Sequence, residues 1–110
     1  MTNLLDDYNE FTKTTAIYPT ALAYDESEAM YLALGLADEA GEVAGKIKKL
    51  FRDGHLDPEA LTKELGDVLW YLTRLSDWNG VTLEEIMLKN TEKLRDRKER
   101  GVLGGSGDER

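Results

Sequence analysis

The chain has 110 residues, which is room for one domain with a small core. Its formal net charge of -8 argues against a nucleic-acid polymer as partner, because phosphate backbones select basic surfaces. Without cysteine, the chain offers no disulfide framework, thiolate metal site or cysteine nucleophile. The sequence shows neither a signal-peptide pattern nor the roughly 20 apolar residues of a membrane span, so we expect a cytoplasmic protein away from membranes.

The first quarter of the chain predicts a short helix followed by a loop. Residues 3–14 place apolar side chains at helical spacing. Residues 14–24 break that pattern, because Pro19 and several β-branched residues favour an extended backbone. A connection of this length in a small domain is often functional.

A long helix is predicted to begin after Asp25, with Glu28 in the capping-box position. It is expected to end at Asp53 and Gly54, because glycine commonly terminates helices. The predicted apolar stripe comprises Met30, Leu32, Leu36, Val43, Ile47 and Leu50.

Two further helices are predicted. One starts at Asp57 and Pro58 and ends near Asn79, and the other opens with a capping box at Thr82 and Glu85. Residues 101–110 are glycine-rich and lack periodicity, which predicts a coil. No strand pattern competes, so we expect an all-α helical bundle of about four helices over residues 1–100, followed by a C-terminal tail.

Two acidic pairs lie inside the predicted apolar stripes. Glu39 and Glu42 have i, i+3 spacing, as do Glu64 and Asp67, so each pair shares one helix face. Packing of the two helices would bring four carboxylates together, and this requires a compensating positive charge. Mg²⁺, or Mn²⁺ in its place, fits because these ions take oxygen ligands. The sequence therefore predicts a metal site at these four residues.

Two alternatives to this metal site fit the sequence less well. Glu42 and Lys46 could form an ordinary i, i+4 surface pair, but Glu39 and Glu64 interrupt apolar stripes and have valines at i+4. A di-iron bundle requires Glu-x-x-His pairs, and the single histidine, His55, lies in a predicted turn. Helix glycines at 35, 41, 45 and 66 indicate close approach of helices or of a metal cluster at this level.

Residues 35–49 (GLADEAGEVAGKIKK) and 63–72 (KELGDVLWYL) resemble the two metal-binding helices of the MazG family of all-α nucleoside triphosphate pyrophosphohydrolases. Together they give that family's ExxE…ExxD motif. The closing helix is also similar, over residues 83–95, and the compact form resembles small phage and bacterial members. The resemblance covers about residues 27–100.

The resemblance implies hydrolysis of a nucleoside or deoxynucleoside triphosphate to the monophosphate and pyrophosphate. The quartet Glu39, Glu42, Glu64 and Asp67 would bind Mg²⁺ and act in catalysis, with water attacking the α-phosphorus. Substrate does not follow from the motif, since dUTPases of narrow specificity share it. A non-catalytic helical interaction module with a structural metal is the alternative from a different class.

Further substrate contacts are expected around this quartet. Lys46 and Lys49 follow the first acidic pair by about one and two turns and could reach phosphates. The resemblance implies contacts from Tyr71, one turn after Asp67, and from Asn90, a polar residue on an otherwise apolar face. Lys93, one turn beyond Asn90, is a further candidate for phosphate binding.

We also expect a homo-oligomer, because a chain of this size has little room to bury three apolar stripes alone. The resemblance implies a dimer or a tetramer, and we favour a tetramer built from two dimers.

Overall fold

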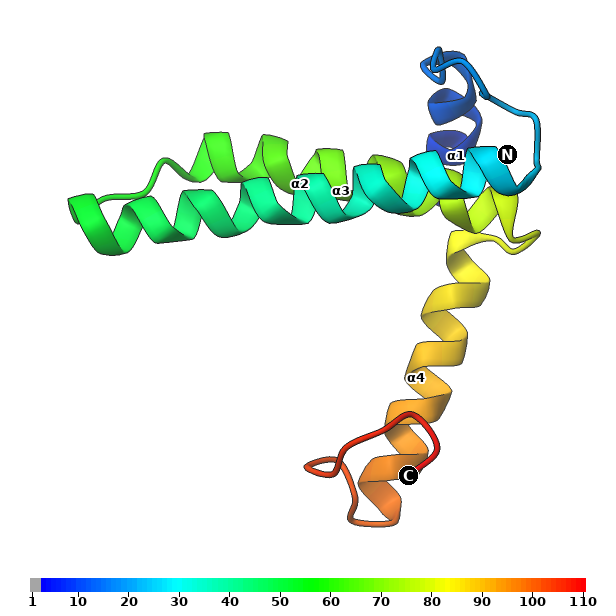
Figure 1. The fold of residues 1–110 in the computed structure, drawn as a ribbon. Coiled ribbons are helices and arrows are strands. Elements are labelled where there is room, and N and C mark those ends of the chain that lie inside the picture. Colours follow the sequence, from blue (N-terminus) through cyan, green and yellow to red (C-terminus); the bar gives the residue numbers. More distant parts are fainter. Residues whose placement is uncertain (1–2) are drawn as a thin grey trace.

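The computed structural model describes residues 3–110 and contains four helices and no strand within that range (Figure 1). Helix α1 spans Leu4–Thr14, α2 Glu26–Asp53, α3 Pro58–Trp78 and α4 Leu83–Glu99. The all-α class is confirmed. None of these helices is long and apolar enough to cross a membrane.

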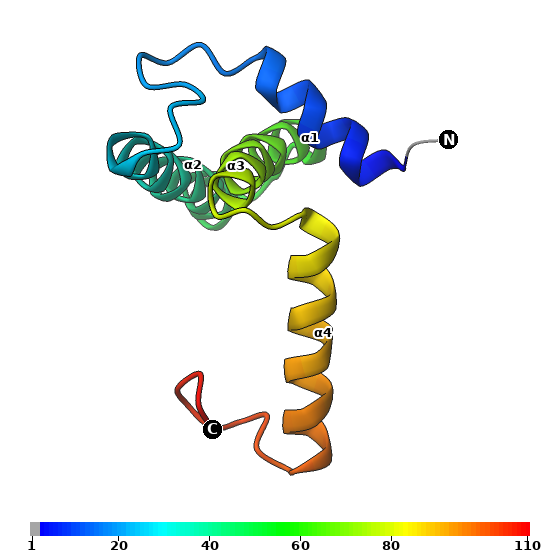
Figure 2. The ribbon, with the colours of Figure 1, turned by 90° about the vertical axis from the view of Figure 1, so that its right-hand side faces the viewer.

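Helices α2 and α3 form an antiparallel hairpin, which is the main packed unit of the chain (Figure 1). Helix α1 packs across α3 near the end where the hairpin is open. Helix α4 leaves the same end and projects away from the hairpin, as the perpendicular view in Figure 2 also shows. The expected four-helix bundle is therefore not closed within one chain.

The helix ends follow the predicted capping chemistry. The side chains of Asp25, Asp57 and Thr82 each accept a backbone N–H of the helix that they precede. Gly54 adopts a left-handed conformation, with φ of 83°, after the last residue of α2. These caps satisfy backbone groups that would otherwise lack partners, and they fix the lengths of the two hairpin helices.

The apolar core is small, and the predicted stripes are only partly buried. Tyr18, Leu32 and Leu83 are the buried apolar side chains of the described chain. The assignment of Met30 to the inner stripe of α2 was wrong, since Met30 lies on the opposite side of the helix and is exposed. Leu65, Leu69 and Leu72 of α3 are also substantially exposed.

Glu28 organises the loop between α1 and α2 from a fully buried position. Its carboxylate accepts the Tyr18 hydroxyl at 2.5 Å and the backbone N–H groups of Leu22 and Tyr24, both at 2.7 Å. Leu22 and Tyr24 have positive φ angles of 60° and 53°, which side chains disfavour. The predicted capping box is therefore half right, because Asp25 caps the Glu28 N–H while the Glu28 carboxylate serves the loop instead.

Arg74 joins α1, α3 and this loop. Its guanidinium is fully buried and donates to the Asp77 carboxylate at 2.6 Å. It also contacts Asn9 and Thr12 of α1 at 3.4 Å. The Tyr24 hydroxyl donates to the same Asp77 carboxylate at 2.6 Å, so one ion pair holds the loop and α1 against α3.

We predict that Glu28→Gln destabilises the fold by about 2–4 kcal/mol, because the amide cannot accept three hydrogen bonds and leaves buried donors unpaired. The matched control is Glu26→Gln, at an exposed position in the same helical turn, where a change within about 0.5 kcal/mol is expected. Urea unfolding of both variants measures the difference. Equal stabilities would show that Glu28 does not anchor the loop.

Candidate functional site

Three of the four predicted acids converge between α2 and α3. Glu39, Glu64 and Asp67 each offer a carboxylate oxygen, and these oxygens all lie within 4.8 Å of one another. Glu39 and Glu64 are half-buried and Asp67 is exposed. The arrangement follows from the helix pairing, because Glu39 and Glu64 occupy the inner stripes that the two helices bury against each other.

Glu42 is adjacent to this acidic cluster without being part of it. Its side chain is exposed, one turn along α2 from Glu39. Its charge still acts on Glu39, since it is among the carboxylates that raise the pKa of that residue. A rotamer change or a bound cation would be needed to bring Glu42 into the cluster.

The carboxylates of the cluster repel one another because like charges are held close together. Burial, followed by the carboxylates of Asp67, Asp38, Glu64 and Glu42, raises the pKa of Glu39 above its usual range. No lysine or arginine forms an ion pair with Glu39, Glu64 or Asp67 within the described residues. An all-oxygen donor set with uncompensated negative charge suits a hard divalent cation such as Mg²⁺.

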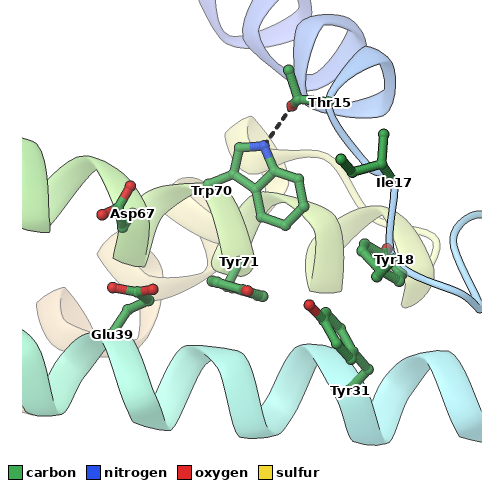
Figure 3. A pocket seen from close by; sticks show the side chains of 8 residues that line it. All are labelled: Thr15, Ile17, Tyr18, Tyr31, Glu39, Asp67, Trp70 and Tyr71. Atoms are coloured by element: carbon green, nitrogen blue, oxygen red, sulfur yellow. Dashed lines mark hydrogen bonds between the residues drawn. The ribbon is translucent and has the colours of Figure 1, made fainter.

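A groove of about 540 Å³ opens directly beside the acids (Figure 3). Two of the acids, Glu39 and Asp67, line it together with four aromatic side chains and two further residues of the loop between α1 and α2. The other lining residues are Thr15, Ile17, Tyr18, Tyr31, Trp70 and Tyr71. The site thus combines a carboxylate end with an aromatic end.

The aromatic side chains of the groove support one another. The rings of Tyr18 and Tyr31 stack with centroids 4.5 Å apart, and Trp70 meets Tyr71 edge to face at 5.0 Å. The Trp70 indole N–H donates to the Thr15 hydroxyl at 2.8 Å, which ties the loop to α3 (Figure 3). The loop that Glu28 holds therefore forms one wall of the groove.

Tyr71 lies between the two ends of the groove and depends on Gly35. A Cβ atom built at Gly35 would overlap the Tyr71 ring, so the missing side chain lets the ring lie against α2. Burial, with the neighbouring Tyr31 hydroxyl and Glu39 carboxylate, raises the pKa of Tyr71 to about 12, so it remains a protonated donor at neutral pH. Among the four helix glycines, only Gly35 shows a close approach within this chain, because a Cβ atom built at Gly41, Gly45 or Gly66 has no described atom within 4 Å beyond its chain neighbours and the local helix backbone.

The other predicted substrate residues lie elsewhere in this chain. Lys46 and Lys49 border a smaller cavity of about 200 Å³ beside the turn between α2 and α3. Asn90 and Lys93 line a separate cavity on α4, the helix that projects away from the hairpin (Figure 1). The Lys93 ammonium pairs with the Asp108 carboxylate of the tail at 3.1 Å. Only Tyr71 among these five residues shares the groove with the acids.

Sequence reasoning missed Tyr18, Tyr31 and Trp70 as site residues. Trp70 follows Asp67 by three residues, and this i, i+3 spacing places both on one side of α3. Tyr31 lies about two turns before Glu39 on α2 and could have been found in the same way. Tyr18 belongs to the loop, whose path depends on the buried Glu28 and leaves no periodic signal.

The comparison with family models identifies the class of protein to which this all-α chain belongs. Residues 27–102 match the model of the MazG nucleotide pyrophosphohydrolase domain, and the chain belongs to this family. The chain is also 44% identical over 112 residues to the Gene 37 protein of Mycobacterium phage L5, covering 96% of this chain and 98% of the phage protein. No solved structure shows a significant match.

We predict that Gly35→Ala displaces the Tyr71 ring and destabilises the protein, although alanine favours helices by about 1 kcal/mol over glycine. The matched control is Gly66→Ala, an exposed helix position with open space, where a gain of up to about 1 kcal/mol is expected. Thermal melts of both variants test this. A Gly35→Ala variant that is as stable as Gly66→Ala would show that the ring is free to move.

We predict that Glu39→Gln melts at or above the wild type without metal near neutral pH. The raised folded-state pKa of Glu39 means a stability penalty that is absent at low pH, appears as pH rises through the unfolded pKa, and is complete above the folded pKa. The amide removes this charge. Mg²⁺ should stabilise the variant less than the wild type, because it binds the folded site. An equal Mg²⁺ response in paired melts would remove Glu39 from the ligands.

Proposed function

We propose that this chain is a Mg²⁺-dependent pyrophosphohydrolase that converts nucleoside or deoxynucleoside triphosphates to the monophosphate and pyrophosphate by attack of water at the α-phosphorus. The observation that carries the proposal is the shared groove: Glu39 and Asp67 line one end, and aromatic rings line the remainder, with Tyr18 and Tyr31 farthest from the acids (Figure 3). A nucleotide has the matching chemistry, with a polyanionic, metal-binding end and a planar base.

The donor set fits Mg²⁺, or Mn²⁺ in its place, because it consists of carboxylate oxygens held close together. Glu39, Glu64 and Asp67 would hold the metal directly, and Glu42 would complete the quartet. Bound Mg²⁺ would neutralise triphosphate charge and lower the pKa of a coordinated water.

The side chains have separable roles in this proposal. One carboxylate of the quartet accepts the proton of the attacking water. The faces of Tyr18, Tyr31 and Trp70 offer stacking surface for the base, a contact that tolerates every base because each has a π face. Tyr71 remains protonated and can donate a hydrogen bond between the two ends of the groove.

The remaining predicted contacts require assembly or movement. Lys46 and Lys49 are proposed phosphate contacts that border a separate cavity in this chain, so movement is needed for them to reach the groove. Asn90 and Lys93 lie on the projecting α4, so in our proposal they serve the groove of another copy. We accordingly propose a homo-oligomer, a tetramer of two dimers.

Hydrolysis in ¹⁸O-water tests the bond that is cleaved. We predict label in the nucleoside monophosphate and none in pyrophosphate, because attack occurs at the α-phosphorus. A panel of ribo- and deoxyribonucleoside triphosphates that includes dUTP, read out as released pyrophosphate, is run in parallel. The matched control is Glu64→Gln, which should abolish turnover.

Two outcomes would contradict the proposal. Label in pyrophosphate, or orthophosphate as the first product, would mean a different reaction. Mg²⁺ binding without hydrolysis of any nucleotide in the panel would favour the non-catalytic module with a structural metal.

A further inference from the structure

The C-terminal tail, residues 101–110, folds back onto α4 instead of extending from it (Figure 1 and Figure 2). Gly101 turns the chain directly after the helix, with φ of 73°, and Gly107 has φ of 83° within the tail. These turns return Asp108 to the side of the helix. The segment predicted as coil therefore has a specific path along α4.

One arginine closes the tail into a loop. The Arg110 guanidinium donates to the backbone carbonyls of Val102, Leu103 and Gly107 at 2.5–3.0 Å. A Cβ atom built at Gly105 would lie 2.7 Å from Arg110 Cδ, so the missing side chain lets Arg110 cross the loop. The tail therefore has a defined shape that its own residues maintain.

Asp108 joins this loop to two cations of α4. Its carboxylate accepts the Lys93 ammonium and Nη2 of Arg97, both at 3.1 Å, and its backbone carbonyl accepts the same Nη2 at 2.7 Å. Lys93 and Arg97 have i, i+4 spacing, so a single carboxylate reaches both. We call Lys93 and Arg97 the α4 basic pair. A third cation, Arg100, donates to the backbone carbonyl of Arg110.

The Asp108 contact is open to competition from other anions. The Asp108 side chain is 79% exposed, and ion pairs of exposed carboxylates are weak and screened by salt. The Arg97 side chain is 5% exposed, yet its Nε has no hydrogen-bond partner in the part of the chain that the structure describes. Asp108 engages only Nη2 of this guanidinium. A phosphate group can engage Nε and Nη2 together, because the arginine donors form a fork that fits two phosphate oxygens.

We propose that the tail is an autoinhibitory clasp: Asp108 occupies the α4 basic pair, and a polyphosphate anion binds there only by displacing the tail. A docked Asp108 neutralises Lys93 and repels phosphate oxygens. The inference rests on the proposed function in that Lys93 is a proposed phosphate contact. The triphosphate of the substrate and the pyrophosphate product share the chemistry that opens the clasp.

NMR relaxation of the tail glycine amides tests the clasp in the full chain, in metal-free buffer so that the acidic cluster cannot hold pyrophosphate through a metal. The ¹H–¹⁵N NOE reports backbone motion on the picosecond to nanosecond timescale. Without added anion, the tail values should resemble those of the helices. Pyrophosphate should lower them, whereas NaCl at equal ionic strength should not. A tail that is mobile from the start, or that stays ordered at every pyrophosphate concentration, would overturn the inference.

Neutralising Asp108 should open the clasp without any anion. Asp108→Asn should mobilise the tail and lower the Kd for pyrophosphate, measured by calorimetry, at least about three-fold, because apparent affinity falls with the fraction of molecules that are closed. The matched control is Glu109→Gln, which removes the same charge at an exposed neighbour that forms no ion pair within the described chain. Equal Kd values for the two variants would contradict the clasp.

Turnover separates the clasp from a positioning role for Asp108. A clasp predicts that Asp108→Asn lowers the KM for a nucleotide at least about three-fold, with kcat within about two-fold of wild type. A raised KM would show that the carboxylate orients the α4 basic pair for substrate, and would overturn the inference. Repeating the NMR titration with dATP shows whether substrate or product opens the tail at the lower concentration. Relaxation and calorimetry need no turnover, so a failure of the proposed function is distinguishable from a failure of the clasp.

Discussion

Repulsion among carboxylates at the contact between α2 and α3 is the constraint on which this structure depends. Glu39, Glu64 and Asp67 bring their oxygens within 4.8 Å of one another, and two of the three side chains are half-buried. Packing the hairpin therefore carries an electrostatic cost that protonation or a bound cation relieves. The raised pKa of Glu39 reflects this repulsion, so the same residues link folding with the proposed metal binding and the proposed chemistry.

The groove also depends on the aromatic rings that line it beside those acids. Glu28 anchors the loop of residues 15–24 from a buried position, where it holds two left-handed residues and the Tyr18 hydroxyl. Arg74 and Asp77 hold the same loop from α3. Buried polar groups thus supply the order that the small apolar core cannot, and they shape the groove.

Local patterns in the sequence predicted the helices and the acids well. The caps at Asp25, Asp57 and Thr82 and the left-handed Gly54 depend on neighbours a few residues away, so propensity and spacing were sufficient. The convergence of Glu39 with Glu64 followed from two apolar stripes that must face each other. The roles of Glu28 and Tyr18 depend on contacts between segments of irregular backbone, and no periodicity encodes these. Met30 was misplaced because α2 has apolar residues on two faces, and composition alone does not say which face meets α3.

The central claim is that the acidic cluster between α2 and α3 binds a divalent metal. Anomalous diffraction from crystals grown with Mn²⁺ tests it most directly, because the ion can be located without reference to activity. The account predicts an anomalous peak within coordination distance of Glu39, Glu64 and Asp67, at about 2.0–2.3 Å from their carboxylate oxygens. Ordered carboxylates with no peak between them, at Mn²⁺ concentrations that support turnover, would contradict it.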